Sequence, residues 1–155
     1  MTQRLLKSNK PLDEIFPSLI QIPDNAYIAT TEDIEITVWP EFINSQNSTA
    51  GNIFIWAYHV KITNKGFDNI KLINRHWKII NEKGEIQEVD GEGVVGEQPI
   101  IIGESSFQYS SGVHLYYPSG IMTGQYQMQR ADGELFQAKI PSFSLDVPSI
   151  KGAIN

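Results

Sequence analysis

The sequence predicts an all-β domain, an antiparallel β-sandwich of the immunoglobulin or fibronectin type III kind. From residue 34 onward, apolar and polar residues alternate with a period of two, in short runs separated by turn residues. No segment longer than two turns has a clear helical period. Trp56 and Trp77 fall on successive central strands, where a sandwich buries large aromatic side chains. Tyr126 stands at the expected start of a late strand, as a tyrosine-corner residue does.

The length of 155 residues suits one domain with a sizeable core. Prolines at positions 11, 17 and 23 interrupt the first apolar stretches, and prolines at this frequency break helices. We therefore expect an irregular N-terminal arm over residues 1–33, the sandwich over 34–150 and a C-terminal tail over 151–155.

The early strands carry the strongest alternation. A half-buried strand is expected over residues 34–38, ending at Pro40, and a polar loop over 44–52 follows it. The next strand, over 54–63, has one face made of Phe54, Trp56, Tyr58, Val60 and Ile62.

Some apolar residues fall outside that face. Ile55, Ala57 and the run over 113–117 mark either an exposed interface or a second layer of core beneath the N-terminal arm.

The later strands are separated by glycine-containing turns. The turn over 82–85 is expected to form a hairpin between strands 70–81 and 86–90. Further strands are expected over 106–111, 123–129 and 136–147. One face of the strand over 70–81 is expected to carry Ile73, Arg75, Trp77 and Ile79.

Composition excludes several classes of function. A net charge of −6 argues against nucleic-acid binding and against an anionic membrane surface. The absence of cysteine excludes disulfides, thiolate catalysis and cysteine-ligated metals. No apolar run approaches the roughly 20 residues that span a membrane, and no signal-peptide pattern is visible. We expect a cytoplasmic protein.

The negative charge is concentrated in one central segment. Between Lys83 and Arg130 there are six acidic residues and no Lys or Arg. Such a segment is either a solvated rim or a surface that binds a cation or a basic partner.

Several ordered motifs between residues 34 and 148 resemble the ApaG family. They are NRHW at 74–77, QEVDGEGVVGEQP at 87–99, GESSFQYSSG at 103–112, GIMTGQYQM at 120–128 and IPSFSL at 140–145. The resemblance implies a fibronectin type III-like sandwich and a bacterial protein connected with cobalt resistance and magnesium efflux. Similar domains in eukaryotic proteins look like protein-interaction modules, and the resemblance implies no catalytic activity.

Within these motifs, Gly91, Gly93 and Gly96 match the pattern G-x-G-x-x-G. In a dinucleotide-binding fold this loop opens a helix, but here Pro99 and an apolar, strand-like run follow it. Glu92 lies inside the loop and would repel a pyrophosphate. The loop is therefore a turn or bulge that needs glycine, an anion site or a cation site.

Arg75 and His76 should point to opposite faces of their strand. If Trp77 points inward, Arg75 shares its face, and a buried guanidinium needs a carboxylate or several carbonyls. Glu88 and Glu97 are candidate carboxylates. Arg75 then either forms an arginine–carboxylate clamp that fixes the glycine-rich loop to the sheet or anchors a ligand. His76 is a candidate metal ligand or pH switch, although a lone surface histidine is more often neither.

These observations predict a non-catalytic binding module without cofactor or metal, whose partner is another protein or a second copy of the chain. The alternative is a sensor of a phosphorylated metabolite, a nucleotide or a divalent cation. The candidate binding residues are Arg75, His76, Gly91, Glu92, Gly93, Gly96, Glu97 and Gln98.

Overall fold

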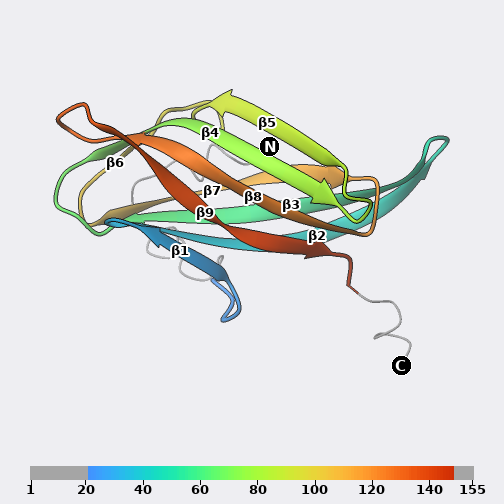
Figure 1. Cartoon of the computed structure of the whole chain (residues 1–155). Coiled ribbons are helices and arrows are strands. Elements are labelled where there is room, and N and C mark those ends of the chain that lie inside the picture. The colour runs from blue at the N-terminus through green and yellow to red at the C-terminus, as the bar shows by residue number, and fades with distance from the viewer. Residues whose placement is uncertain (1–20, 149–155) are drawn as a thin grey trace.

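The computed structural model describes residues 21–148, in which every regular element is a β-strand (Figure 1). Two antiparallel sheets pack face to face, which confirms the predicted all-β sandwich. The first sheet has the order β1-β2-β3-β7, with β1 at Tyr27–Thr31, β2 at Ile34–Ser48, β3 at Gly51–Asn64 and β7 at Ser105–Leu115. The second has the order β5-β4-β8-β9, with β5 at Ile86–Glu92, β4 at Ile70–Asn81, β8 at Ser119–Gln129 and β9 at Leu135–Asp146. The short β6 (Ile100–Ile101) also pairs with β4.

The centre of the core lies between β3 and β4. The inward residues of β3, from Trp56 to Ile62, are at most 6% exposed, as the alternation predicted. Trp77 of β4 packs edge-on against Tyr58 and Tyr126, with ring centroids 5.2 and 6.5 Å away. Burial of these large rings supplies much of the apolar contact between the sheets.

The last part of the predicted irregular arm is a strand. β1 pairs with β2 from Tyr27 opposite Val38 to Thr31 opposite Ile34. The three prolines of the arm's sequence all precede β1, so none interrupts this ladder. Residues 1–20, which form most of the predicted arm, and residues 149–155 lie outside the described part of the chain.

The predicted loop over residues 44–52 is wrong, because these residues form the outer end of the β2–β3 hairpin. Asn44 lies opposite Ile55 and Ser48 opposite Gly51. The β2 residues here are exposed on both faces, so the apolar period that marks a half-buried strand is missing. Pro40 also lies within β2 rather than ending it. Pairing with β1 stops at Val38, so the proline removes no hydrogen bond on that side.

A bulge in β4 moves Ile73 off the predicted inward face. The register against β8 shifts between Leu72 and Asn74, so Leu72 is fully buried and Ile73 only half-buried. Arg75 and Trp77 follow on the inward side, as expected.

The structure also changes the roles predicted for Tyr126 and for the apolar run over residues 113–117. Tyr126 is in the middle of β8, and its hydroxyl hydrogen-bonds the hydroxyl of Tyr109 on the facing sheet. It is therefore a cross-sheet contact and not a tyrosine corner. Leu115 is only 4% exposed and Val113 packs against the core, so this run is not an outer apolar surface, although Tyr116 is exposed.

The two sides of the sandwich differ. On one side the edge strands β1 and β9 are joined, since the main-chain N–H groups of Lys139 and Ser144 donate to the hydroxyls of Thr31 and Tyr27. On the other side β5 pairs only with β4 and β7 only with β3, in the part of the chain that the structure describes. We call the β5–β7 side the open side. No helix in residues 21–148 is long and apolar enough to cross a membrane.

Candidate ligand-binding site

Arg75 lies on the inward face of β4, at the open side. Its cross-strand partner on β5 is Gly91, and the next inward pair is Trp77 with Val89. Because directly opposed residues share a face, the inner surface of β5 consists of glycine, valine and Gln87 and carries no charge.

The guanidinium of Arg75 holds the glycine-rich loop by its main chain. Nη1 donates to the carbonyl oxygens of Glu92 at 3.2 Å and Gly93 at 2.8 Å. A Cβ at Gly91 would lie 2.6 Å from Cζ of Arg75, so the arginine occupies the space of the missing side chain. Arg75 thus clamps the loop, but through these main-chain carbonyls and not through the carboxylate of Glu88 that was a candidate partner.

The loop itself is a tight turn. Val94 and Glu97 exchange main-chain hydrogen bonds of 2.8 and 2.9 Å around Val95 and Gly96, whose φ angles are 43° and 82°. Two central residues with positive φ define a type I′ turn. Gly93 has a φ of 63°, and a Cβ there would lie 1.9 Å from the carbonyl oxygen of Glu97.

The bulge of β4 fixes the loop in place. The carbonyl of Ile73 accepts from the main-chain N–H of Gly93 at 2.7 Å and from the side-chain amide of Gln98 at 3.0 Å. With the bonds of the turn, the amides of Gly93, Val94 and Glu97 are all engaged within the protein. A phosphate cradled by these amides would first have to displace those bonds, at a cost of about 1 kcal/mol each.

His76 lies on the opposite, outer face of the sheet, as predicted. Its Nδ1 is 2.6 Å from Asp90 Oδ1 and its Nε2 is 3.2 Å from Glu88 Oε1. Glu88 therefore pairs with His76 and not with Arg75, because the pleat sends alternate β5 residues outward. The structure thus brings Arg75, Gly91, Glu92, Gly93 and Gln98 together and sets His76 apart from them.

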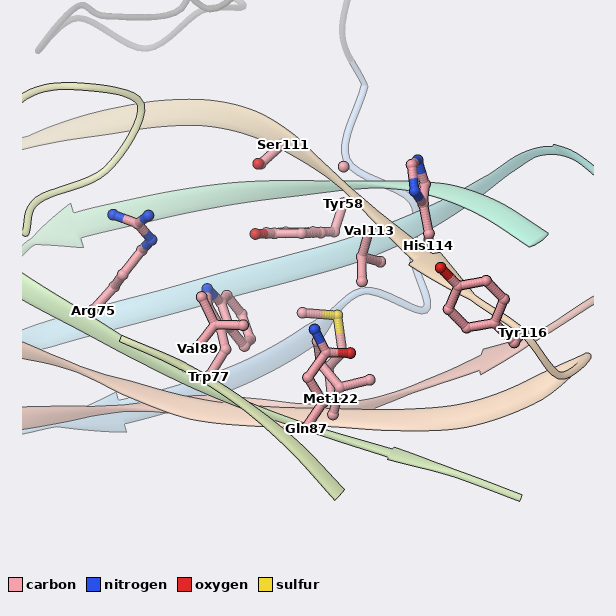
Figure 2. Close-up of a pocket in the computed structure, with 12 residues that line it drawn as sticks. Tyr58, Arg75, Trp77, Gln87, Val89, Ser111, Val113, His114, Tyr116 and Met122 are labelled. Carbon is pink, nitrogen blue, oxygen red and sulfur yellow. The ribbon is translucent and has the colours of Figure 1, made fainter. Parts of the chain in front are cut away.

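A pocket of about 380 Å³ opens beside Arg75, between the two sheets at the open side (Figure 2). This volume is within the range of small-molecule sites. Figure 2 shows Arg75 at one end and Val113, Met122 and Tyr116 toward the other. Its lining residues, all within the described range, include one guanidinium and no carboxylate.

Two buried polar groups face the Arg75 end of the pocket. Trp77 is 3% exposed, and its indole N–H has no hydrogen-bond partner. The indole nitrogen and the phenol oxygen of Tyr58 point toward the guanidinium end in Figure 2. Burial raises the pKa of Tyr58, while a hydrogen bond with Ser111 and the positive charge of Arg75 lower it. The phenol is therefore neutral at pH 7 and able to donate.

Tyr109 and Tyr126 form a buried pair that the charge of Arg75 also influences. The hydroxyls of Tyr109 and Tyr126 hydrogen-bond each other in the core, and burial raises the pKa of both, which the charge of Arg75 partly offsets. Both phenols therefore stay protonated and uncharged at pH 7.

Sequence reasoning missed that Tyr58, Trp77 and Ser111 line a pocket with Arg75, and it placed the two aromatic residues in the core. The alternation of the two strands could have indicated them, because it places Tyr58 and Trp77 on the inward surface of the sandwich together with Arg75. Only the sheet order shows that this surface ends at an open side. Among residues 21–148, no group of three or more His, Cys, Asp or Glu side chains is arranged to hold a metal ion.

Comparison with known proteins shows the family of this chain. The family model described as the ApaG domain matches residues 44–130, which include every pocket residue. The chain belongs to the ApaG family. It is 48% identical over 129 residues to Protein ApaG of Paramagnetospirillum magneticum and 49% identical over 129 residues to that of Methylocella silvestris. Each alignment covers 83% of this chain and 99% of the relative.

Solved structures agree with the ApaG assignment. The putative ApaA protein from Bordetella pertussis has 36% identity and a TM-score of 0.70, over 75% of this chain and 94% of that one. A structural-genomics target known by its X-ray structure has 40% identity and a TM-score of 0.74, over 76% and 89%. The curated relatives carry only the name ApaG, which indicates no catalytic activity.

Proposed function

We propose that this ApaG chain is a non-catalytic binding module whose binding surface is the open side of the sandwich. The observation that carries the proposal is the pocket beside Arg75, flanked by the edge strands β5 and β7. A concave site with a few convergent polar groups is the usual form of a ligand-binding site.

The preferred occupant is a segment of a protein partner. An edge strand presents unpaired main-chain N–H and C=O groups, and an extended peptide can pair with them. β5 and β7 offer two such edges next to a pocket that would receive a side chain or a chain end. A second copy of the chain could use the same edges, which would make a homodimer.

A small-ligand sensor is the second candidate. It is favoured by the unpartnered indole N–H of Trp77 at the pocket that Arg75 borders, because a buried donor without an acceptor is costly. Binding of a ligand that accepts this hydrogen bond would remove the cost.

The family's connection with cobalt resistance and magnesium efflux belongs to the same proposal. We propose that the chain is cytoplasmic and contributes to cobalt resistance and magnesium efflux through the molecule that it binds.

Site-specific photo-cross-linking tests the proposed surface. A photo-reactive phenylalanine analogue replaces Tyr116, which is 63% exposed at the pocket, or Leu135, which is 53% exposed on β9. Cross-linked partner, or cross-linked dimer, is expected from position 116 and not from 135. Equal yields at the two positions, or cross-links from 135 alone, would contradict the proposal.

A further inference from the structure

We propose that the pocket beside Arg75 binds a carboxylate that carries an apolar group, with the carboxylate held by Arg75, Trp77 and Tyr58. This inference rests on the proposed function, since it names the chemistry that the open side recognises. The same chemistry is found in a free carboxylic acid and in the C-terminus of a peptide that ends in an apolar residue.

Three donor groups of the pocket lie at its guanidinium end. Arg75, the indole N–H of Trp77 and the phenol of Tyr58 all face the same end of the cavity (Figure 2). A carboxylate has two oxygens with several lone pairs and can accept from all three groups. The Trp77 donor is 97% buried and lacks a partner; Trp56 has an unpartnered donor too, but only Trp77 lines the pocket, so its N–H is the one that a bound acceptor would satisfy.

The charge of the site selects a monoanion. Arg75 is the only permanently charged group among the described residues that line the pocket, and His114, the other side chain there that can carry a positive charge, lies toward the far end (Figure 2). A carboxylate would be neutralised by the guanidinium. A phosphate monoester or a pyrophosphate would leave at least one negative charge without a partner in a partly buried site, which is strongly unfavourable.

The rest of the pocket selects an apolar body. Ile79, Val113 and Met122 line the part away from the arginine, Val89 lies beside Trp77, and Tyr116 lies at the exposed end. A ligand with its carboxylate at Arg75 would therefore cover these side chains with its hydrocarbon portion and point outward past Tyr116.

The acidic segment of the sequence supports this arrangement. The carboxylates of Glu88 and Asp90 lie on the outer face with His76, so the pleat of β5 keeps them away from the pocket. An acidic protein thereby retains a cavity that is positively charged.

Calorimetric titration of the full chain with four probes tests the inference. The probes are hexanoate, hexanamide, the peptide acetyl-Gly-Gly-Leu with a free C-terminus, and the same peptide with a C-terminal amide. Both carboxylates should bind at least tenfold more tightly than their amides. Binding of the amides as tight as that of the acids, or no binding of either acid, would overturn the proposal. A peptide affinity well above that of hexanoate would assign a protein terminus, and the reverse would assign a free acid.

Variants locate the site. Trp77→Phe and Tyr58→Phe keep an aromatic ring and remove one donor, and each should weaken hexanoate binding about tenfold, as loss of a hydrogen bond to a charged group does. Trp56→Phe is the matched control, because its indole N–H is also buried and unpartnered but does not line the pocket. Equal effects of the Trp56 and Trp77 substitutions would contradict the proposal. If cross-links map to position 116 while no acid binds, the proposed function stands and only the carboxylate inference fails.

Discussion

The guanidinium of Arg75 fills the space that a side chain would occupy at Gly91, its cross-strand partner. The nearest guanidinium atoms are 2.6 Å from the position of a Cβ at residue 91. Because Gly91 has no side chain, the guanidinium of Arg75 can lie against the inner face of β5, which carries no charge. From there it donates hydrogen bonds to carbonyls of the glycine-rich loop and also borders the pocket.

Substitution of Gly91 should therefore disturb both stability and the pocket. Gly91→Ala is expected to lower the free energy of unfolding by about 1–3 kcal/mol, because the arginine must move. Gly112→Ala is the matched control in β7, where a Cβ would meet only the carbonyl of Trp56 at 3.4 Å, and should change stability by less than about 0.5 kcal/mol. Urea denaturation measures both. Equal effects of the two substitutions would show that the Arg75–Gly91 contact is not tight.

The turn at the end of the glycine motif predicts the order of stability of three glycine variants. Gly96→Ala should cost about 1–2 kcal/mol because its φ of 82° is unfavourable for an L-residue, and Gly96→Asn should cost less, since asparagine tolerates this region. Gly93→Ala should be worse than Gly96→Ala, because its Cβ would also collide with the carbonyl of Glu97. Thermal denaturation of the three variants gives the order, and a Gly96→Asn variant less stable than Gly96→Ala would contradict the type I′ turn.

The outer-face position of His76 predicts that it is dispensable for binding. His76→Ala removes exposed pairs with Asp90 and Glu88 and should lower stability by less than about 1 kcal/mol. Hexanoate affinity should stay unchanged. A large loss of hexanoate affinity would place the binding site on the outer face of the sheet.

The buried tyrosine pair predicts a loss of stability at high pH. Burial raises the pKa of Tyr109 and Tyr126 in the folded protein, whereas in the unfolded chain tyrosine has a pKa of about 10. Above that pH the unfolded state releases protons that the folded state retains, so the free energy of unfolding falls as pH rises. Each tyrosine contributes up to about 1.4 kcal/mol per pH unit.

A double variant isolates this effect. Tyr109→Phe/Tyr126→Phe removes both ionisable groups and should make the fall of stability above pH 10 less steep, with a remaining slope from Tyr58, whose pKa is also raised. Tyr126→Phe alone should cost about 1–3 kcal/mol at pH 7, since it leaves the Tyr109 hydroxyl buried without its partner. Parallel pH profiles for the double variant and the unchanged chain would contradict the assignment.

Most of the fold could be predicted from alternation, because β3, β4 and β8 are half-buried strands whose inward residues are apolar. The β2–β3 hairpin tip could not, since it is exposed on both faces and has no apolar period. The bulge at Ile73 could not either. The bulge adds one residue to β4, so the residues before it face the opposite way from what a continuous alternation predicts. Only the register with β8 shows this.

The candidate site was predicted in part. The alternation of β4 placed Arg75 inward and His76 outward, and the glycines of the loop indicated positive φ angles. The pocket depends on which strands lie at the edges of the two sheets, and this long-range property is not encoded in the local period. Tyr58 and Trp77 therefore looked like ordinary core residues.

The most direct measurement is a two-dimensional ¹H–¹⁵N spectrum of the tryptophan indole N–H groups during titration with hexanoate. The chain has three tryptophans, so three indole signals are expected, and the Trp77→Phe and Trp56→Phe variants assign two of them. If the pocket beside Arg75 is the binding site, the Trp77 signal moves downfield as its N–H gains an acceptor, while the Trp56 signal stays in place. An unmoved Trp77 signal at saturating hexanoate, or equal shifts of both signals, would contradict a site at Arg75.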